Sequence, residues 1–205
     1  MLSQHVAKLG RAVCLCLFVG GNTATAADCG PKVEAEFQRL RTSGRAYRIE
    51  TVVDGDQQGR TEIFEFVPPD RMRLRYRFKE GDDWAEFVRV GGRVWDHEKE
   101  LPGELANLFD EQTERLGRPL GALECLGPVK FSGKTYTGYR THQLQFLLST
   151  VRTAERRAYW RTVLVDRKTG ALAHEMATLE RQLSKPKWWK RYTYPDDIAI
   201  DPPKQ

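Results

Sequence analysis

The sequence predicts a mainly β protein, in which a curled antiparallel sheet forms an incomplete β-barrel closed by helices. Many short segments alternate apolar and polar residues, as half-buried strands do, and turn signals separate them at spacings of about ten residues. Two other segments carry apolar residues at helical spacing. Because about ten strands in one domain are too many for a flat sheet, we expect the sheet to curl.

The first 27 residues are typical of a cleavable export signal. Lys8 and Arg11 precede the apolar run AVCLCLFVGG, which is too short to span a membrane, and the small residues NTATAA follow it. We expect cleavage after Ala27, which leaves residues 28–205 as a single domain in the periplasm. No later run approaches the roughly 18 apolar residues of a membrane-spanning helix.

The cysteines predict one disulfide. Cys14 and Cys16 leave with the signal, so Cys29 and Cys125 remain, and an oxidising compartment favours a bridge between them. The alternative is a pair of free buried thiols. Lipidation of Cys29 is not expected, because the preceding residues AAD are not those of a lipoprotein signal.

The mature chain has a mixed surface charge. The formal net charge of the whole chain is +5, and loss of the two basic signal residues lowers it to +3. A strongly basic nucleic-acid-binding protein would be more one-sided, so we expect no nucleic acid as partner.

Two amphipathic helices are expected. The segment 29–44 has a proline near its start, ends at Gly44, and places Val33, Phe37 and Leu40 on one side. The segment 101–117 ends at a glycine and has an apolar side formed by Leu101, Leu105, Leu108, Phe109 and Leu116. The second helix interrupts the strands and is expected to cover the open side of the curled sheet.

The remaining segments alternate with period two and are expected to form consecutive antiparallel strands. Before the second helix they are residues 46–53, 61–67, 71–78, 84–90 and 93–97. After it they are residues 124–133, 134–148, 156–166, 171–180 and 187–194, with 195–205 as a final short strand.

The strand RMRLRYRF, residues 71–78, places an arginine at every second position. A strand sends all four arginines to one side, and a hairpin around PPD sets Glu65 opposite Arg73 as a favourable charge pair. We favour a solvated outer face with acidic neighbours, and a functional membrane or partner surface is the alternative. The arginines concerned are Arg71, Arg73, Arg75 and Arg77.

The apolar sides of the strands, together with the second helix, are expected to line the interior. They define the predicted hydrophobic ligand cavity, whose residues are Phe64, Phe66, Leu74, Tyr76, Val88, Trp95, Leu105, Leu108, Phe109, Leu144, Phe146, Trp160, Leu164 and Met176.

The segment KPKWWKRYTY interleaves cations with aromatic rings. This composition suits an anionic membrane interface, and the alternative is an edge strand protected by lysines. It also suits stacked single-stranded nucleic acid, but the export signal argues against that. The residues of this surface are Lys187, Trp188, Trp189 and Lys190.

Catalytic and metal-binding patterns are not evident. The chain has no Gly-x-Ser-x-Gly motif, and His97, His142 and His174 fall on separate strands without metal-ligand spacing. We expect neither an enzyme nor a cofactor or metal. An enzyme that uses His174 with Thr162 is the least favoured hypothesis.

The order of elements, and the strings PDRMRLRY, VGGRVWDH, LVDRKTGALAHE and YTYPDDIAIDPP, resemble the LolA/LolB-like superfamily of periplasmic lipoprotein carriers. The resemblance covers most of the mature chain. It implies an apolar hollow for acyl chains, and a lid that a specific arginine controls. Arg48 or Arg73 could occupy the strand of that arginine, and neither is assigned the role.

We therefore predict a non-enzymatic, monomeric periplasmic carrier or binding protein for lipid, lipoprotein acyl chains or another hydrophobic ligand. A membrane surface or an envelope protein is a further possible partner. The alternative function is an envelope protein-protein interaction module whose interior is solid. Members of one fold need not share a ligand, so the sequence leaves the ligand open.

Overall fold

The computed structural model describes residues 29–53, 59–103, 106–107, 109–110, 122–146, 156–181, 183 and 186–203. The side chains of residues 143–146 and 156–158 are not part of that description. The predicted signal peptide, residues 1–27, and most of the predicted second helix lie outside it. In the described part of the chain no helix is long and apolar enough to cross a membrane.

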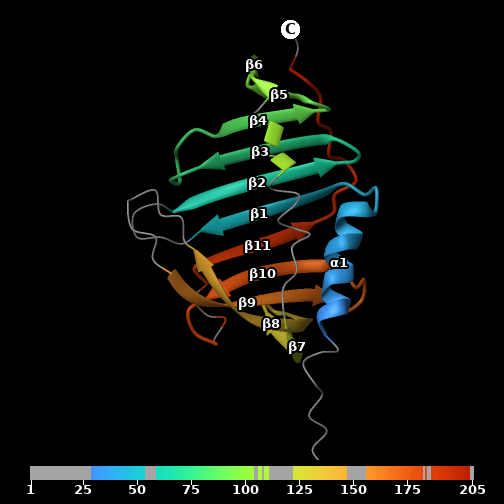
Figure 1. Ribbon diagram of the computed structural model, residues 1–205, viewed down its shortest axis with the longest axis vertical. Helices are drawn as coiled ribbons and strands as arrows, with labels where there is room; N and C mark the ends of the chain where they lie inside the picture. The colour runs from blue at the N-terminus through green and yellow to red at the C-terminus, as the bar shows by residue number, and fades with distance from the viewer. Residues whose placement is uncertain are drawn as a thin grey trace, which may run out of the picture.

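In the described part of the chain, eleven strands form one antiparallel sheet in the order β6-β5-β4-β3-β2-β1-β11-β10-β9-β8-β7. The chain starts near the middle at β1, reaches one edge at β6, continues at the other edge with β7, and returns to the middle at β11 (Figure 1). The strands are β1 (Tyr47–Val53), β2 (Arg60–Val67), β3 (Arg71–Arg77), β4 (Ala85–Val90), β5 (Arg93–Asp96), β6 (Lys99–Leu101), β7 (Glu124–Phe131), β8 (Lys134–Phe146), β9 (Arg156–Asp166), β10 (Leu172–Thr178) and β11 (Trp188–Thr193).

The predicted fold class is confirmed. The two edge strands β6 and β7 do not pair with each other, so the sheet is not closed into a barrel. Its strands coincide with the segments of the sequence that alternate with period two. Successive side chains of a strand point to opposite sides of the sheet, which explains the alternation.

Helix α1 (Gly30–Thr42) covers one side of the sheet. It runs across the strands rather than along them (Figure 1). Its buried residues Val33, Phe37 and Leu40 are those that the helical spacing predicts, and the ring of Phe37 meets the edge of Tyr192 in β11 with centroids 6.5 Å apart. We call the side that α1 covers the helix face, and the other side the opposite face.

The predicted disulfide is present. Cys29, immediately before α1, is bonded to Cys125 in β7, with their Cα atoms 5.9 Å apart. The bridge therefore ties the start of the helix to the far edge of the sheet, 96 residues along the chain.

The predicted second helix is described only in part. Residues 106–107 and 109–110 are helical, and Ala106 and Phe109 are buried in the helix-face core. Leu101, however, is the last residue of β6, so the prediction that the helix begins there is wrong. Leu101 pairs with Val94 of β5 and is thus part of the edge strand of the sheet.

The C-terminal tail also differs from the prediction. Residues 194–203 contain no strand, although a final short strand was expected at 195–205. Arg71 donates to the carbonyl oxygen of Ile200 and pairs with the carboxylate of Asp201. The tail is thus held by side chains instead of by a ladder of backbone hydrogen bonds, and Ile200 packs on Val88 and Trp95.

Candidate functional site on the helix face

The helix face carries the larger apolar core of the described residues. In the middle of the sheet, Ile49 of β1 lies between Phe64 of β2 and Tyr192 of β11. The same cluster includes Phe66 and Met72, and it reaches from α1 to β3 and β5. Partly buried apolar side chains, Leu74 and Phe87 among them, continue it toward the end of β3.

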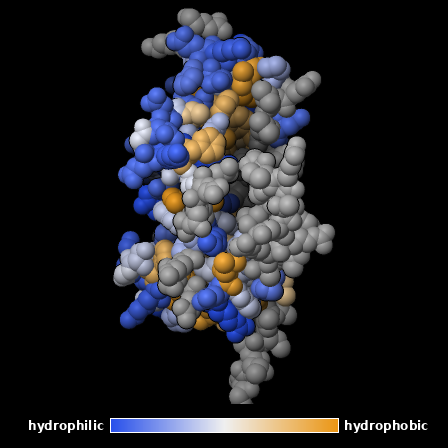
Figure 2. Space-filling model, turned by 90° about the vertical axis from the view of Figure 1, so that its left-hand side faces the viewer, coloured by the Kyte–Doolittle hydropathy of each residue, from blue (hydrophilic) through white to orange (hydrophobic). Residues whose placement is uncertain are grey.

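Three aromatic side chains end this face. The ring of Tyr76 stacks on Phe87 with centroids 6.1 Å apart, and it meets the edge of Phe78 at 5.6 Å. Phe78 is 52% exposed, whereas most large apolar side chains of the described chain are buried or half-buried. We call Tyr76, Phe78 and Phe87 the aromatic rim. It lies where β3 ends. Figure 2 views the molecule from the side on which β3 ends in Figure 1, and hydrophobic residues interrupt the hydrophilic surface of that side.

A charged group is buried beneath α1 on the same face. Glu175 of β10 is only 1% exposed, and its carboxylate accepts hydrogen bonds from Arg161 at 2.6 Å and from the Tyr192 hydroxyl at 2.7 Å. Lys190 faces Glu175 across the β10–β11 pair. These partners explain why a charge is tolerated at this depth.

The pKa values follow from these contacts. Burial by itself would raise the pKa of Glu175, but the charges of Arg161 and Lys190, with the hydrogen bonds from Tyr192 and Arg161, outweigh burial and lower the pKa to about 2. Burial and the nearby carboxylate raise the pKa of Tyr192 well above its ordinary value. Glu175 is therefore ionised and Tyr192 is neutral at pH 7. Sequence reasoning missed this cluster, and its one signal is a glutamate next to Met176 and Ala177 in a predicted strand.

The structure brings together only part of the predicted cavity lining. On the helix face it places Phe64, Phe66, Leu74, Tyr76 and Phe109. Leu105 and Leu108, and the side chains of Leu144 and Phe146, lie outside the description.

The other predicted lining residues lie on the opposite face, namely Val88, Trp95, Trp160, Leu164 and Met176. Arg73 pairs with Val88, so β4 turns that valine to the side of the arginines. Leu164 and Met176 pack there with Tyr136. One cavity on the helix face cannot include these five residues, and their assignment to the same interior is corrected.

The arginine stripe lies on the opposite face, as the expected alternation requires. Glu65 is fully buried, and its two carboxylate oxygens accept hydrogen bonds from Arg48 and Arg73, each at 2.6 Å from the Nε atom. Burial opposes ionisation of Glu65, but the hydrogen bonds from Arg73 and Arg48 keep its pKa below the ordinary value. Arg48 and Arg73, the two candidates for a lid arginine, therefore both point away from α1.

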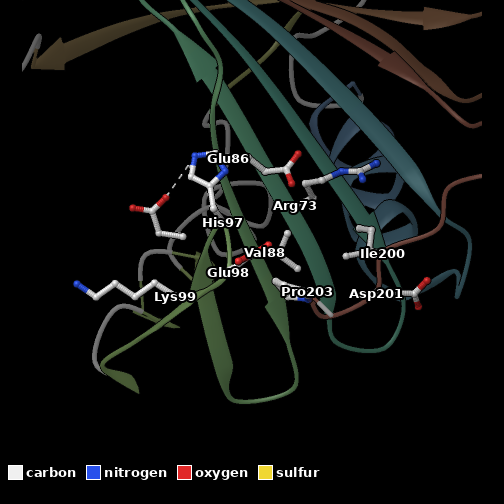
Figure 3. A pocket seen from close by; sticks show the side chains of 10 residues that line it. Arg73, Glu86, Val88, His97, Glu98, Lys99, Ile200, Asp201 and Pro203 are labelled. Carbon is white, nitrogen blue, oxygen red and sulfur yellow. Dashed lines mark ion pairs between the residues drawn. The ribbon is translucent and has the colours of Figure 1, made fainter. Parts of the chain in front are cut away.

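A pocket of about 640 Å³ opens on the opposite face near the edge of the sheet (Figure 3). Strands β3 and β4, the turn between β5 and β6, and the C-terminal tail enclose it. His97, in that turn, lies 3.8 Å from a carboxylate oxygen of Asp96. Charged side chains dominate the lining, and Val88 is the one predicted cavity residue in it, so this pocket is not the apolar cavity that the sequence predicts.

The segment that interleaves lysines and tryptophans is not an edge strand. Strand β11 lies between β1 and β10, in the middle of the sheet, so the edge-strand interpretation is wrong. Trp188 and Lys190 lie on the helix face, with the Lys190 ammonium 5.4 Å from the Trp188 ring, while Trp189 lies on the opposite face with Met176. The backbone of Lys187 donates to the carbonyl oxygen of Ala177. These four residues therefore do not form a single membrane surface.

The three histidines lie apart. His97 is in the β5–β6 turn, the His142 ring is 4.7 Å from Trp160, and His174 packs between Phe131 and Tyr136. Among the residues that the structure describes, no three metal-binding side chains come close enough to hold an ion. His174 and Thr162 are not directly paired, because His174 faces Leu164 and Thr162 faces Met176.

Comparisons with known proteins add information on the fold. No protein-family model matches the sequence, and no curated protein shows significant similarity to it. The crystal structure of LprF from Mycobacterium bovis aligns with a TM-score of 0.54 at 7% identity, over 88% of this chain and 99% of LprF.

Two other solved structures show weaker likeness. The Mycobacterium tuberculosis lipoprotein LppX aligns with a TM-score of 0.48 at 15% identity, over 83% of this chain and 99% of LppX. MucB, in its complex with MucA(peri), aligns with a TM-score of 0.41 at 16% identity, over 86% of this chain and 57% of MucB. The likeness to LprF shows the fold: this chain has the LolA/LolB-like fold that the sequence predicts.

Proposed function

We propose that the chain is a non-enzymatic carrier or binding protein of the cell envelope that binds an acyl chain or a similar hydrophobic ligand on the helix face. The observation that supports this most is the aromatic rim, where the helix-face core continues into half-exposed aromatic side chains. An apolar ligand that lies on this surface removes it from water, which is the main driving force for such binding. The LolA/LolB-like fold is compatible with that role, and a fold alone does not fix a ligand.

The charged residues on the helix face favour a ligand that has an apolar chain and one polar end. Lys190 and the ionised Glu175 lie in the middle of the face, and the apolar side chains lie on either side of them. An acyl chain that enters past the aromatic rim reaches apolar surface first. Its polar end is expected to stay outside or near Lys190, because a polar group buried without a partner is costly.

The proposed location is the periplasm, reached through the predicted signal peptide. The mature chain, residues 28–205, is therefore the form to test. Export also accounts for the disulfide, which persists in an oxidising compartment.

The test measures binding of the apolar fluorophore N-phenyl-1-naphthylamine to the mature chain. Phe78→Ala removes a side chain that is still about half exposed. Burying the remaining half of a phenylalanine surface of about 200 Å² contributes about 2 kcal/mol. We therefore expect the affinity to fall by roughly ten- to thirtyfold.

The matched control is Leu179→Ala. Leu179 is 43% exposed and follows β10, so strands β2, β1 and β11 separate it from Phe78 in the sheet. The affinity of this variant should stay within about twofold. A wild-type chain that binds no fluorophore, and that carries no lipid detectable by mass spectrometry after purification from the periplasm, would overturn the proposal.

A further inference from the structure

The four arginines of β3 are not equivalent. Arg71 contacts Asp201 at 3.1 Å and Arg73 contacts Glu65 through two nitrogen atoms. Arg75 lies 3.9 Å from Glu65, whose oxygens already accept hydrogen bonds from two other arginines, and Arg77 has no ion pair among the described residues. Arg71 and Arg73 are thus hydrogen-bonded to carboxylates of the protein itself, whereas Arg75 has only a long contact with Glu65 and Arg77 has no ion pair among the described residues.

The local charge is unbalanced. Among the described residues, Arg48, Arg73, Arg75 and Arg77 lie together on the opposite face with Glu65 and Glu86, while Glu50 of the same face pairs with Arg191. Four positive and two negative charges leave a surplus of two. Arg73 and Glu86 project from neighbouring strands on this face (Figure 3). A surplus of this size attracts an anionic group at close range.

The guanidinium groups of Arg75 and Arg77 both lie near the ring of Trp84. The guanidinium carbon of Arg77 lies 4.8 Å from the ring centre of Trp84, and that of Arg75 lies 6.0 Å from it. Both are within reach of a cation–π interaction, which orients the planar groups. The Nε atoms of both arginines are buried and have no hydrogen-bond partner. We call Arg75, Arg77 and Trp84 the arginine–tryptophan patch.

The spacing of the two arginines indicates the shape of the anion. They are two residues apart on one strand and on one side of it, so they repeat at about 6.6–7 Å along the strand. Carboxylates at alternate positions of an extended peptide have the same repeat, because such a peptide also turns every second side chain to one side.

The protein's own tail provides a precedent on the same stripe. Arg71 holds a segment without secondary structure through the carbonyl oxygen of Ile200 and the carboxylate of Asp201. We propose that Arg75, Arg77 and Trp84 bind an extended acidic segment of a partner protein, with glutamate or aspartate at alternate positions, beside the site that the tail occupies.

The experiment measures binding of a fluorescein-labelled peptide, Glu-Thr-Glu-Thr-Glu, to the mature chain by fluorescence anisotropy at low salt and at 0.15 M salt, an ionic strength of about the physiological value. The uncharged peptide Gln-Thr-Gln-Thr-Gln is the control ligand. We expect the acidic peptide to bind at least about tenfold more tightly, and the difference to shrink as salt rises.

Arg75→Gln/Arg77→Gln should weaken binding of the acidic peptide by about tenfold or more. The control Arg167→Gln/Lys168→Gln removes the same charge from an exposed turn between β9 and β10 and should change the affinity less than twofold. Circular dichroism checks that each variant is folded. If the double variant does not fold, Arg77→Gln alone carries the test, because Arg77 makes no ion pair with Glu65.

Three results would overturn the proposal. The first is equal weakening of binding by the two double variants, which would mean that only net charge matters. The second is equal binding of the acidic and the uncharged peptide. The third is binding of vesicles that contain phosphatidylglycerol through Arg75 and Arg77 without binding of the peptide, which would make the patch a membrane contact.

Discussion

Replacing Glu175 with glutamine is the most direct test of how the helix face is held together. The change keeps the size and shape of the side chain but removes its negative charge. Arg161, only 13% exposed, then lies beneath α1 without its counter-charge, and the amide offers one carbonyl oxygen where the carboxylate offered two to Arg161 and Tyr192. With the side chain in the same position, the amide oxygen replaces one of the two carboxylate acceptors and the amide NH2 replaces the other.

The size of the effect follows from the pKa of Glu175. It falls from an ordinary value of 4.5 to about 2 in the folded chain, and a difference of one pKa unit corresponds to 1.36 kcal/mol, so the ionised carboxylate stabilises the fold by about 3 kcal/mol. Loss of one member of a buried pair costs about 3–5 kcal/mol, which agrees with this value. Because the folded pKa is the lower one, the contribution is complete above pH 4.5 and is lost as pH falls through about 2.

Urea unfolding of the mature wild-type chain and of Glu175→Gln, followed by circular dichroism at pH 7 and pH 3, measures this contribution. The free energies of unfolding should differ by about 3 kcal/mol at pH 7, and by only about 1–2 kcal/mol at pH 3. Other carboxylates titrate in both chains, so their effects cancel in the difference. A difference below about 1 kcal/mol at pH 7, or one that is the same at both pH values, would refute the reasoning.

Two further predictions concern stability. Glu65→Gln should lower the free energy of unfolding by about 3–5 kcal/mol, because Arg48 and Arg73 both lose a fully buried carboxylate; a change under about 1 kcal/mol in urea unfolding would contradict this. Cys29→Ser/Cys125→Ser should cost about 4–5 kcal/mol on the chain-entropy model for a bridge across 96 residues. An unchanged melting temperature on thermal unfolding would show that the bridge contributes little.

Much of the fold is readable from the sequence, because each hairpin fixes its own register. The turn PPD sets Phe66 opposite Met72 and Glu65 opposite Arg73, and the structure has both pairs. The disulfide and the buried side of α1 are also as predicted. These features depend on local spacing, or on a cysteine pair with no competitor.

The assignment of faces is harder, because alternation gives the two sides of a strand but not which side meets the helix. Val88 and Trp95, both predicted to line the cavity, pair with each other, yet this pair lies on the opposite face. The sheet buries apolar residues on both faces, so an apolar side is no evidence for the helix side. A register irregularity between Leu172 and His174 adds to this, since it sets Leu172 opposite Val165 and His174 opposite Leu164, so the two ends of the pairing follow different registers.

The candidate site was predictable only in part for the same reason. Tyr76 and Phe64 follow from the strand pattern. The Glu175 cluster joins the consecutive strands β9, β10 and β11, and it was missed because alternation alone does not show that the side with Glu175, Arg161 and Tyr192 is the one that α1 covers. The central place of β11 depends on its pairing with β1, which is distant in sequence and cannot be read from one chain.

Among the described residues, each face of the sheet buries one glutamate bound by arginine, and the difference between the two clusters separates their proposed functions. Under α1, Glu175 is bound by Arg161 and Tyr192 within an apolar core, so this face suits an apolar ligand. On the opposite face, Glu65 leaves arginine charge uncompensated, so that face suits an anionic one. The two proposals are therefore independent. The variant that lacks the Phe78 ring should bind the acidic peptide normally, and the variant that lacks the two patch arginines should bind the apolar fluorophore normally. If one variant lost both activities, the two faces would have to be parts of a single site.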